Sequence, residues 1–154
     1  MIQLTRSVRQ RFTWGGVTIG PSPEICLSAR VVNAGRAEGE ALVSPEPIGF
    51  LGGVEPETGV VIEPGHPLEG ESVAGRVLIF PTGKGSTVGS YTLYRLARNG
   101  LAPAAIINAE ADPVVAVGAV IAEIPMVDQV DISRIQTGDW VEVRGDQVVI
   151  SAAA

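Results

Sequence analysis

The second half of the chain alternates short apolar runs with longer amphipathic segments. The apolar runs are rich in β-branched residues, which is typical of buried strands. Asn99-Gly100 is a favourable helix end, and Asp112-Pro113 is a favourable helix start. This order predicts a βαβαβ unit. Its expected elements are strand 76–80, helix 87–98, strand 104–108, a buried helix 114–122 and strand 124–127. The β-branched residues of 114–122 also permit a strand there.

The first half contains only short apolar runs between turns that are rich in glycine and proline. The pattern predicts strands at 27–32, 41–43 and 60–62, with a turn-rich link over 33–39. Short strands at this spacing favour a small sandwich or barrel.

Two β-rich runs near the C-terminus, 140–143 and 147–150, flank a Gly-Asp turn and predict a hairpin. We therefore expect an α/β fold with a β-rich first half, a βαβ unit and a closing hairpin. The expected division of the chain is an N-terminal arm with the first strand (1–36), one main domain (37–150) and a tail (151–154).

Composition and charge narrow the functional classes. Of the 154 residues, 45% are hydrophobic but only 5% are aromatic, so the core must consist of Val, Ile, Leu and Ala. The net charge of −6 argues against a nucleic-acid partner and an anionic membrane surface. Charged residues make up only 18%, which favours an apolar surface that a partner covers. With no apolar h-region and no apolar run of membrane-spanning length, we expect a cytoplasmic protein.

The loop after the apolar run 76–80 is the strongest candidate for chemistry. It contains Gly83, Lys84, Gly85, Ser86 and Thr87 and leads into the predicted helix. A strand that feeds a glycine loop at a helix start points several N–H groups at one spot, which suits an anion. We expect Ser86 to be catalytic and the other four residues to bind the substrate.

Two alternatives exist for this loop. It fails the Walker pattern, because Leu78 stands where the first glycine belongs and Gly85 where the hydroxyl residue belongs. We therefore reject nucleotide hydrolysis. The second alternative is an ordinary strand-to-helix turn in which Ser86 or Thr87 is the N-cap, and the residues alone leave it open.

The remaining candidate residues favour structural roles. His66 is expected to face solvent or brace its loop, because a lone histidine is rarely a metal ligand. Cys26 cannot form an internal disulfide and is expected to be a small buried residue. Asp112, Asp128 and Asp131 are expected to be caps and turn residues, so the sequence predicts no metal site.

The N-terminal arm carries a small basic cluster, Arg6, Arg9 and Arg11, followed by Trp14. We expect a solvated arm. The alternative is an arm that docks on a partner, with Trp14 as its anchor.

Several spaced motifs together resemble the small subunit of the aconitase X family, over roughly residues 37–145. The resemblance depends on the order of the motifs rather than on any one of them. The motifs are 39–44, the segment Glu46 to Gly59, His66-Pro67-Leu68, the loop Gly83 to Tyr91, the segment Asn99 to Ile107 and Ile124 to Asp128.

This resemblance implies a swivelling β/β/α domain. It implies a dehydratase (hydro-lyase) subunit that is inactive without a large subunit, whose own cysteines bind iron or an iron–sulfur cluster. The active site would form between the two subunits. The resemblance also implies a role for Ser86, which is similar to the aconitase serine that abstracts a proton.

The resemblance leaves two substrates. The long N-terminal arm and the Ala-, Gly- and Arg-rich composition resemble bacterial members, which favours cis-3-hydroxy-L-proline, with phosphomevalonate as the alternative. Two other classes remain: a phosphotransfer swivel domain, which would need a histidine in a glycine-rich turn, and an inert interaction domain.

Overall fold

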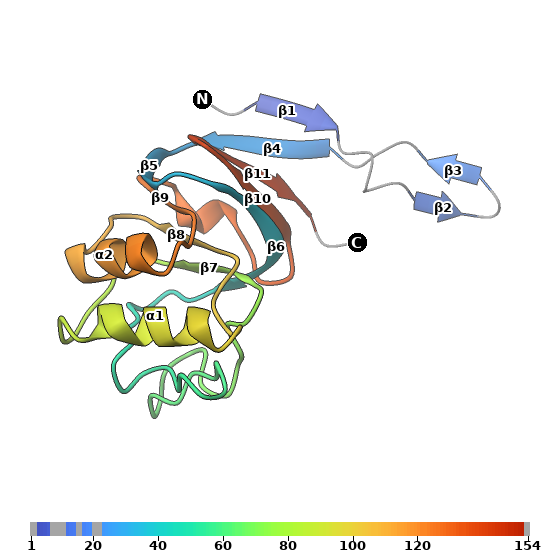
Figure 1. Ribbon diagram of the computed structural model, residues 1–154. Helices are drawn as coiled ribbons and strands as arrows, with labels where there is room; N and C mark the ends of the chain where they lie inside the picture. Colours follow the sequence, from blue (N-terminus) through green and yellow to red (C-terminus); the bar gives the residue numbers. More distant parts are fainter. Residues whose placement is uncertain (1–2, 7–11, 15–16, 20–22, 153–154) are drawn as a thin grey trace.

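The computed structural model describes residues 3–6, 12–14, 17–19 and 23–152. Its main feature is a nine-stranded mixed sheet in the order β1-β4-β11-β10-β6-β7-β8-β9-β5, with two helices against it (Figure 1). The strands are β1 (Gln3–Arg6), β4 (Pro23–Ser28), β5 (Arg30–Asn33), β6 (Arg36–Val43), β7 (Val77–Phe80), β8 (Ala105–Asn108), β9 (Met126–Asp128), β10 (Trp140–Arg144) and β11 (Gln147–Ser151). The helices are α1 (Gly89–Arg98) and α2 (Pro113–Ile121), and β2 (Phe12–Trp14) pairs with β3 (Val17–Ile19) in a separate sheet.

Strands β6, β7, β8 and β9 are parallel, and α1 and α2 are the crossovers between β7, β8 and β9. The predicted βαβαβ unit is therefore confirmed. Leu78, Phe80, Ile106 and Met126 point toward the helices and share one core cluster with Leu93 of α1. Since parallel strands end at one edge, the loops that follow them lie together there.

The antiparallel strands form a second β layer. Hairpin β10–β11 pairs with β6 on one side and with β4 on the other, in the register Trp140↔Glu40 and Ile150↔Ile25. Val141, Val143 and Val148 of the hairpin share a cluster with residues on the helix-free face of the parallel strands. The result is a β/β/α arrangement, so both the predicted fold class and the closing hairpin are confirmed.

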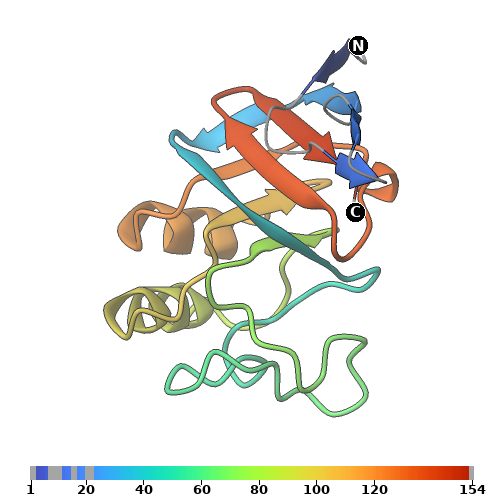
Figure 2. The same ribbon diagram turned by 90° about the vertical axis from the view of Figure 1, so that its right-hand side faces the viewer.

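Residues 44–76 connect β6 to β7 as a long segment of turns (Figure 2). Their only strand pairing is three isolated bridges, of which one joins Val54 to Val61 and one joins Ile48 to Gly83. The predicted strand 60–62 is therefore wrong. The described strands of the first half form no separate sandwich or barrel, because β4, β5 and β6 belong to the same sheet as the strands of the second half. The apolar side chains here fill the end of the helix-side core instead of pairing in a sheet.

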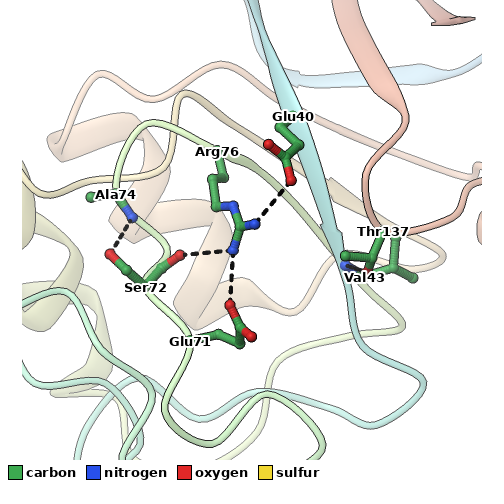
Figure 3. A network of polar contacts seen from close by, with 7 residues as sticks. All are labelled: Glu40, Val43, Glu71, Ser72, Ala74, Arg76 and Thr137. Atoms are coloured by element: carbon green, nitrogen blue, oxygen red, sulfur yellow. Dashed lines mark hydrogen bonds and ion pairs between the residues drawn. The ribbon is translucent and has the colours of Figure 1, made fainter. Parts of the chain in front are cut away.

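Arg76 fixes the end of this segment to the sheet (Figure 3). Its guanidinium donates to the Ser72 carbonyl and forms ion pairs with Glu71 and with Glu40 of β6, at 3.2 and 3.1 Å. The Val43 N–H, at the end of β6, donates to the Thr137 hydroxyl at 3.0 Å.

Several boundaries differ from the prediction. Most of the expected link 33–39 belongs to β6, because its register with β10 satisfies the backbone despite the polar sequence. The expected strand 27–32 is interrupted at Ala29, where β4 ends before β5 begins. Ser151 ends β11 opposite Trp140 and is buried, so it is not part of a tail. The expected domain boundary after residue 36 falls inside β6, and strands on both sides belong to one sheet.

No described helix has both the length and the apolar character needed to cross a bilayer.

Candidate functional site

The glycine loop leaves β7 at Pro81 and enters α1 at Gly89, at the carboxyl edge of the parallel strands. Ile48 holds its first half, because the Lys84 N–H donates to the Ile48 carbonyl at 3.1 Å and the Ile48 N–H donates to the Thr82 carbonyl at 3.3 Å. Gly85 adopts a φ of +93°, which a side chain would strain. The chain thereby turns outward, and residues 84–88 are all exposed.

Ser86 lies at the outer end of this loop with an exposed side chain. Its Oγ accepts the Val88 N–H at 3.2 Å, and its carbonyl accepts the Gly89 N–H at 2.9 Å. The hydroxyl thus caps the turn before α1. The N-cap of the helix itself is Val88, so the alternative in which Ser86 or Thr87 is the N-cap is wrong.

The loop also presents three consecutive backbone donors. Within the described part of the chain, the N–H groups of Gly85, Ser86 and Thr87 donate to no protein acceptor. They lie beside the Ser86 hydroxyl and one turn ahead of α1, whose partial positive charge lies at that end. This arrangement can bind a carboxylate, a phosphate or a developing oxyanion.

The Lys84 side chain forms an ion pair beside the loop. Its Nζ forms an ion pair with Glu63 at 3.0 Å, and both side chains retain solvent contact. The ammonium therefore lies beside the loop while its charge is partly balanced. The sequence offered no signal for Glu63, because 21 residues separate it from Lys84.

Close backbone packing fixes the loop on both sides. A Cβ at Gly49 would lie 3.0 Å from the Lys84 carbonyl oxygen, and one at Gly53 would lie 1.9 Å from the Gly49 carbonyl oxygen. On the other side, a Cβ at Gly83 would lie 2.5 Å from a Val115 methyl of α2. The glycine-punctuated segment 48–54 was visible in the sequence, but its contact with the loop was not.

Asp112 is a helix cap, as predicted, and it also lies against the glycine loop. Its Oδ1 caps α2 by accepting the N–H groups of Val114 and Val115, at 2.9 and 3.3 Å. Pro113 fills the first helical position. The same oxygen would lie 3.1 Å from a Cβ at Gly83, so the start of α2 directly supports the loop.

Asp128 is a buried anion rather than the expected cap or turn residue. It ends β9 with no exposed surface and accepts two hydrogen bonds from Arg30, at 2.8 and 2.6 Å. The Ala111 N–H donates to it at 2.8 Å. Burial acts to raise the pKa of this carboxyl, but the hydrogen bonds from Arg30 and Ala111 outweigh burial, so the pKa lies below its ordinary value.

The other candidate residues have structural positions. His66 is buried, its Nδ1 accepts the Leu68 N–H and its Nε2 lies 3.0 Å from the Pro47 carbonyl, so it braces its loop. Cys26 is buried as expected, and Asp131 caps a short 3-10 helix. Among the described residues, no three His, Cys, Asp or Glu side chains are placed to hold a metal ion. Of the basic arm, Arg9 and Arg11 lie outside the described residues.

Comparisons with known proteins agree on one family. The family model described as the aconitase X swivel domain matches residues 26–152. A phosphomevalonate dehydratase small subunit from Methanosarcina acetivorans is 54% identical over 126 residues, covering 80% of this chain and 88% of that protein. One from Methanocella arvoryzae is 59% identical over 119 residues, covering 75% and 90%.

A solved structure agrees with these relatives. The crystal structure of Thermococcus kodakaraensis aconitase X, in its holo-form, superposes with a TM-score of 0.80 at 51% identity. The match covers 81% of this chain and 97% of that chain. The chain therefore belongs to the aconitase X family, in which it corresponds to the swivel domain.

Proposed function

We propose that this chain is the small subunit of a dehydratase and supplies one half of an active site that a large subunit completes. The relatives are named as dehydratase small subunits, which supports both the reaction class and the need for a partner. The observation that carries the proposal is the exposed Ser86 hydroxyl beside three backbone N–H groups that have no acceptor within the described residues. We also propose, from composition, a cytoplasmic location.

Ser86 is the proposed base. Dehydration breaks a C–H bond next to an acidifying group, and the electron pair forms the double bond as the neighbouring C–O bond breaks. Ser86 Oγ, once ionised, takes the C–H proton and returns to a neutral hydroxyl. The substrate's hydroxyl group leaves as hydroxide and becomes water by taking up the proton that the ionisation of Ser86 released. A serine needs help to ionise, and the N–H groups at the start of α1 favour the charged oxygen. Lys84 adds positive charge nearby, balanced in part by Glu63.

The residues described here do not form a site for iron. They include no cluster of three suitable ligands, and the single cysteine is buried in the sheet. We therefore assign the iron or iron–sulfur cluster expected for the family to the large subunit. Binding the acid and moving its proton are the tasks left to this chain.

Phosphomevalonate becomes the first candidate substrate, because the relatives reported above are named phosphomevalonate dehydratase small subunits. Its phosphate and carboxylate are both anions that the N–H groups can bind. cis-3-Hydroxy-L-proline, favoured by the sequence alone, stays a prediction. A phosphotransfer role is disfavoured, since both ring nitrogens of His66 have partners and the ring is buried.

The test is a reconstituted complex of this chain with its large subunit, assayed for the unsaturated product from each substrate. We expect turnover of phosphomevalonate, none by either subunit alone, and little of cis-3-hydroxy-L-proline. Turnover of the proline derivative alone would reverse the substrate assignment. No turnover of either compound by a complex that has assembled and carries its metal would contradict the dehydratase proposal.

A further inference from the structure

Helix α2 has an apolar surface on every side. Between Asp112 and Glu123 the chain has no charged or polar side chain. Val115, Gly118 and Ala119 are buried against α1 and the sheet. A helix that is hydrophobic all round is normally buried, as the sequence predicted for 114–122. That prediction is only half right, because Val117 is 54% exposed and Val120 is 53% exposed.

This open face is hollowed rather than flat. Val117, Val120 and Ile121 line a cavity of about 230 Å³ together with Val32 of β5. Contiguous exposed apolar surface often marks an interaction site, because transferring it from water to an interface lowers the free energy. We name the exposed side chains of α2 and Val32 the α2 face.

The α2 face continues into the candidate site. A second cavity, of about 210 Å³, is lined by Thr87, Ser90, Pro113, Val114 and Val117. Val117 therefore belongs to both cavities, and Thr87 follows Ser86 directly. Gly118 allows this closeness, since a Cβ there would lie 3.1 Å from the Ser90 Cα. A large partner that reaches Ser86 from this side must also cover the α2 face.

We propose that the α2 face is the docking surface for an apolar patch of the large subunit. This inference rests on the proposed function, which requires another chain to complete the site at Ser86. Continuity between the α2 face and the site loop identifies the occupant. A second copy of this chain on the same face would bring only another copy of the same half-site.

The chain's own first strands do not reach this face. Strand β1 pairs with β4, whereas β5, the strand that contacts α2, pairs with β9. Figure 1 shows β1, β2 and β3 on the side of the molecule away from α1 and α2.

The experiment measures the affinity of this chain for its large subunit by titration calorimetry. Val117→Asp and Val120→Asp each place a charge on the α2 face, and we expect each to weaken binding about tenfold or more. Val117→Thr, of equal shape, should weaken it less. Gln147→Glu adds the same charge at an exposed position of β11 and should bind as the wild type does. Thermal unfolding of each variant alone checks that the exposed substitutions leave the fold intact.

Wild-type affinity of both aspartate variants would overturn the docking inference, and an active wild-type complex would leave the proposed function standing. Weakened binding by both variants, with a wild-type complex that converts neither substrate, would support the docking surface and contradict the proposed function. If the variants abolished self-association of this chain and left the affinity for the large subunit unchanged, the α2 face would belong to a second copy and the inference would be wrong.

Discussion

At the scale of single residues, a buried ion pair lies behind the candidate site. Asp128 has no exposed surface, whereas its partner Arg30 is largely in solvent. Asp128 also accepts the Ala111 N–H, one residue before Asp112. Asp112 in turn caps α2 and lies against Gly83. The carboxylate at the end of β9 therefore orients the turn that supports the loop.

We predict that Asp128→Asn lowers the free energy of unfolding by about 1–3 kcal/mol at neutral pH, because charge-assisted hydrogen bonds are lost in a buried place. The difference from wild type should shrink in acid. The pKa of folded Asp128 lies below the ordinary 3.8, so the unfolded chain takes up the proton first. The stabilisation is complete above about pH 5 and is lost as the pH falls through the folded pKa.

Urea unfolding at pH 7 and near pH 3.5 measures both effects. Asp131→Asn is the control, because that carboxylate is exposed and its hydrogen bonds from the described residues come from Ser133 alone. An Asp128→Asn deficit that stays constant with pH would show that the Asp128 charge contributes nothing.

At the scale of elements, the start of α2 connects helix stability to loop position. Asp112 accepts two helical N–H groups, and the α2 residue Val115 lies against Gly83. The loop rests on a helix end that a single side chain caps.

Asp112→Ala should cost about 1 kcal/mol of stability, the usual value of an N-cap. Asp112→Asn keeps an acceptor oxygen in the same place and should cost much less. Chemical denaturation of the two variants against wild type makes the comparison. Equal losses in both would mean that the negative charge matters and the cap geometry does not.

The same elements show how far the sequence predicts the structure. Local patterns specified β7, α1, β8, α2 and the hairpin, because each depends on periodicity and on nearby caps such as Asp112-Pro113. They also placed the glycine loop between a strand and a helix, and the role of Ser86 in that loop stays a prediction. Contacts between distant segments could not be predicted. Glu63 meets Lys84, Arg30 meets Asp128 and Gly49 meets Lys84 only because the fold brings them together.

The burial of α2 was overpredicted for a different physical reason. An apolar sequence predicts that a helix is buried, but it does not show whether the same chain or a partner chain buries it. Likewise, residues 44–76 contain strand-like runs that form turns, because their apolar side chains fill the core beside Phe50 and Phe80 rather than pairing in a sheet.

At the scale of the whole molecule, two β layers and one helical layer place the candidate functional groups at one edge, where the parallel strands end. The hairpin and β4 cover the helix-free face of the parallel strands, and α1 and α2 cover the other face. The edge where the parallel strands end carries the Ser86 loop, its N–H donors and the start of the α2 face. The central claim is that this edge is the catalytic half of a shared active site, with Ser86 as its base.

The most direct test is the kcat of the reconstituted complex that carries Ser86→Ala. The substitution removes one exposed oxygen and its hydrogen bond from the Val88 N–H, at a cost of about 1 kcal/mol, so the fold and the affinity for the large subunit should be retained. We predict a kcat lower by about 10²- to 10⁴-fold, the usual contribution of a general base. A fully assembled Ser86→Ala complex with a kcat close to that of the wild type would contradict it.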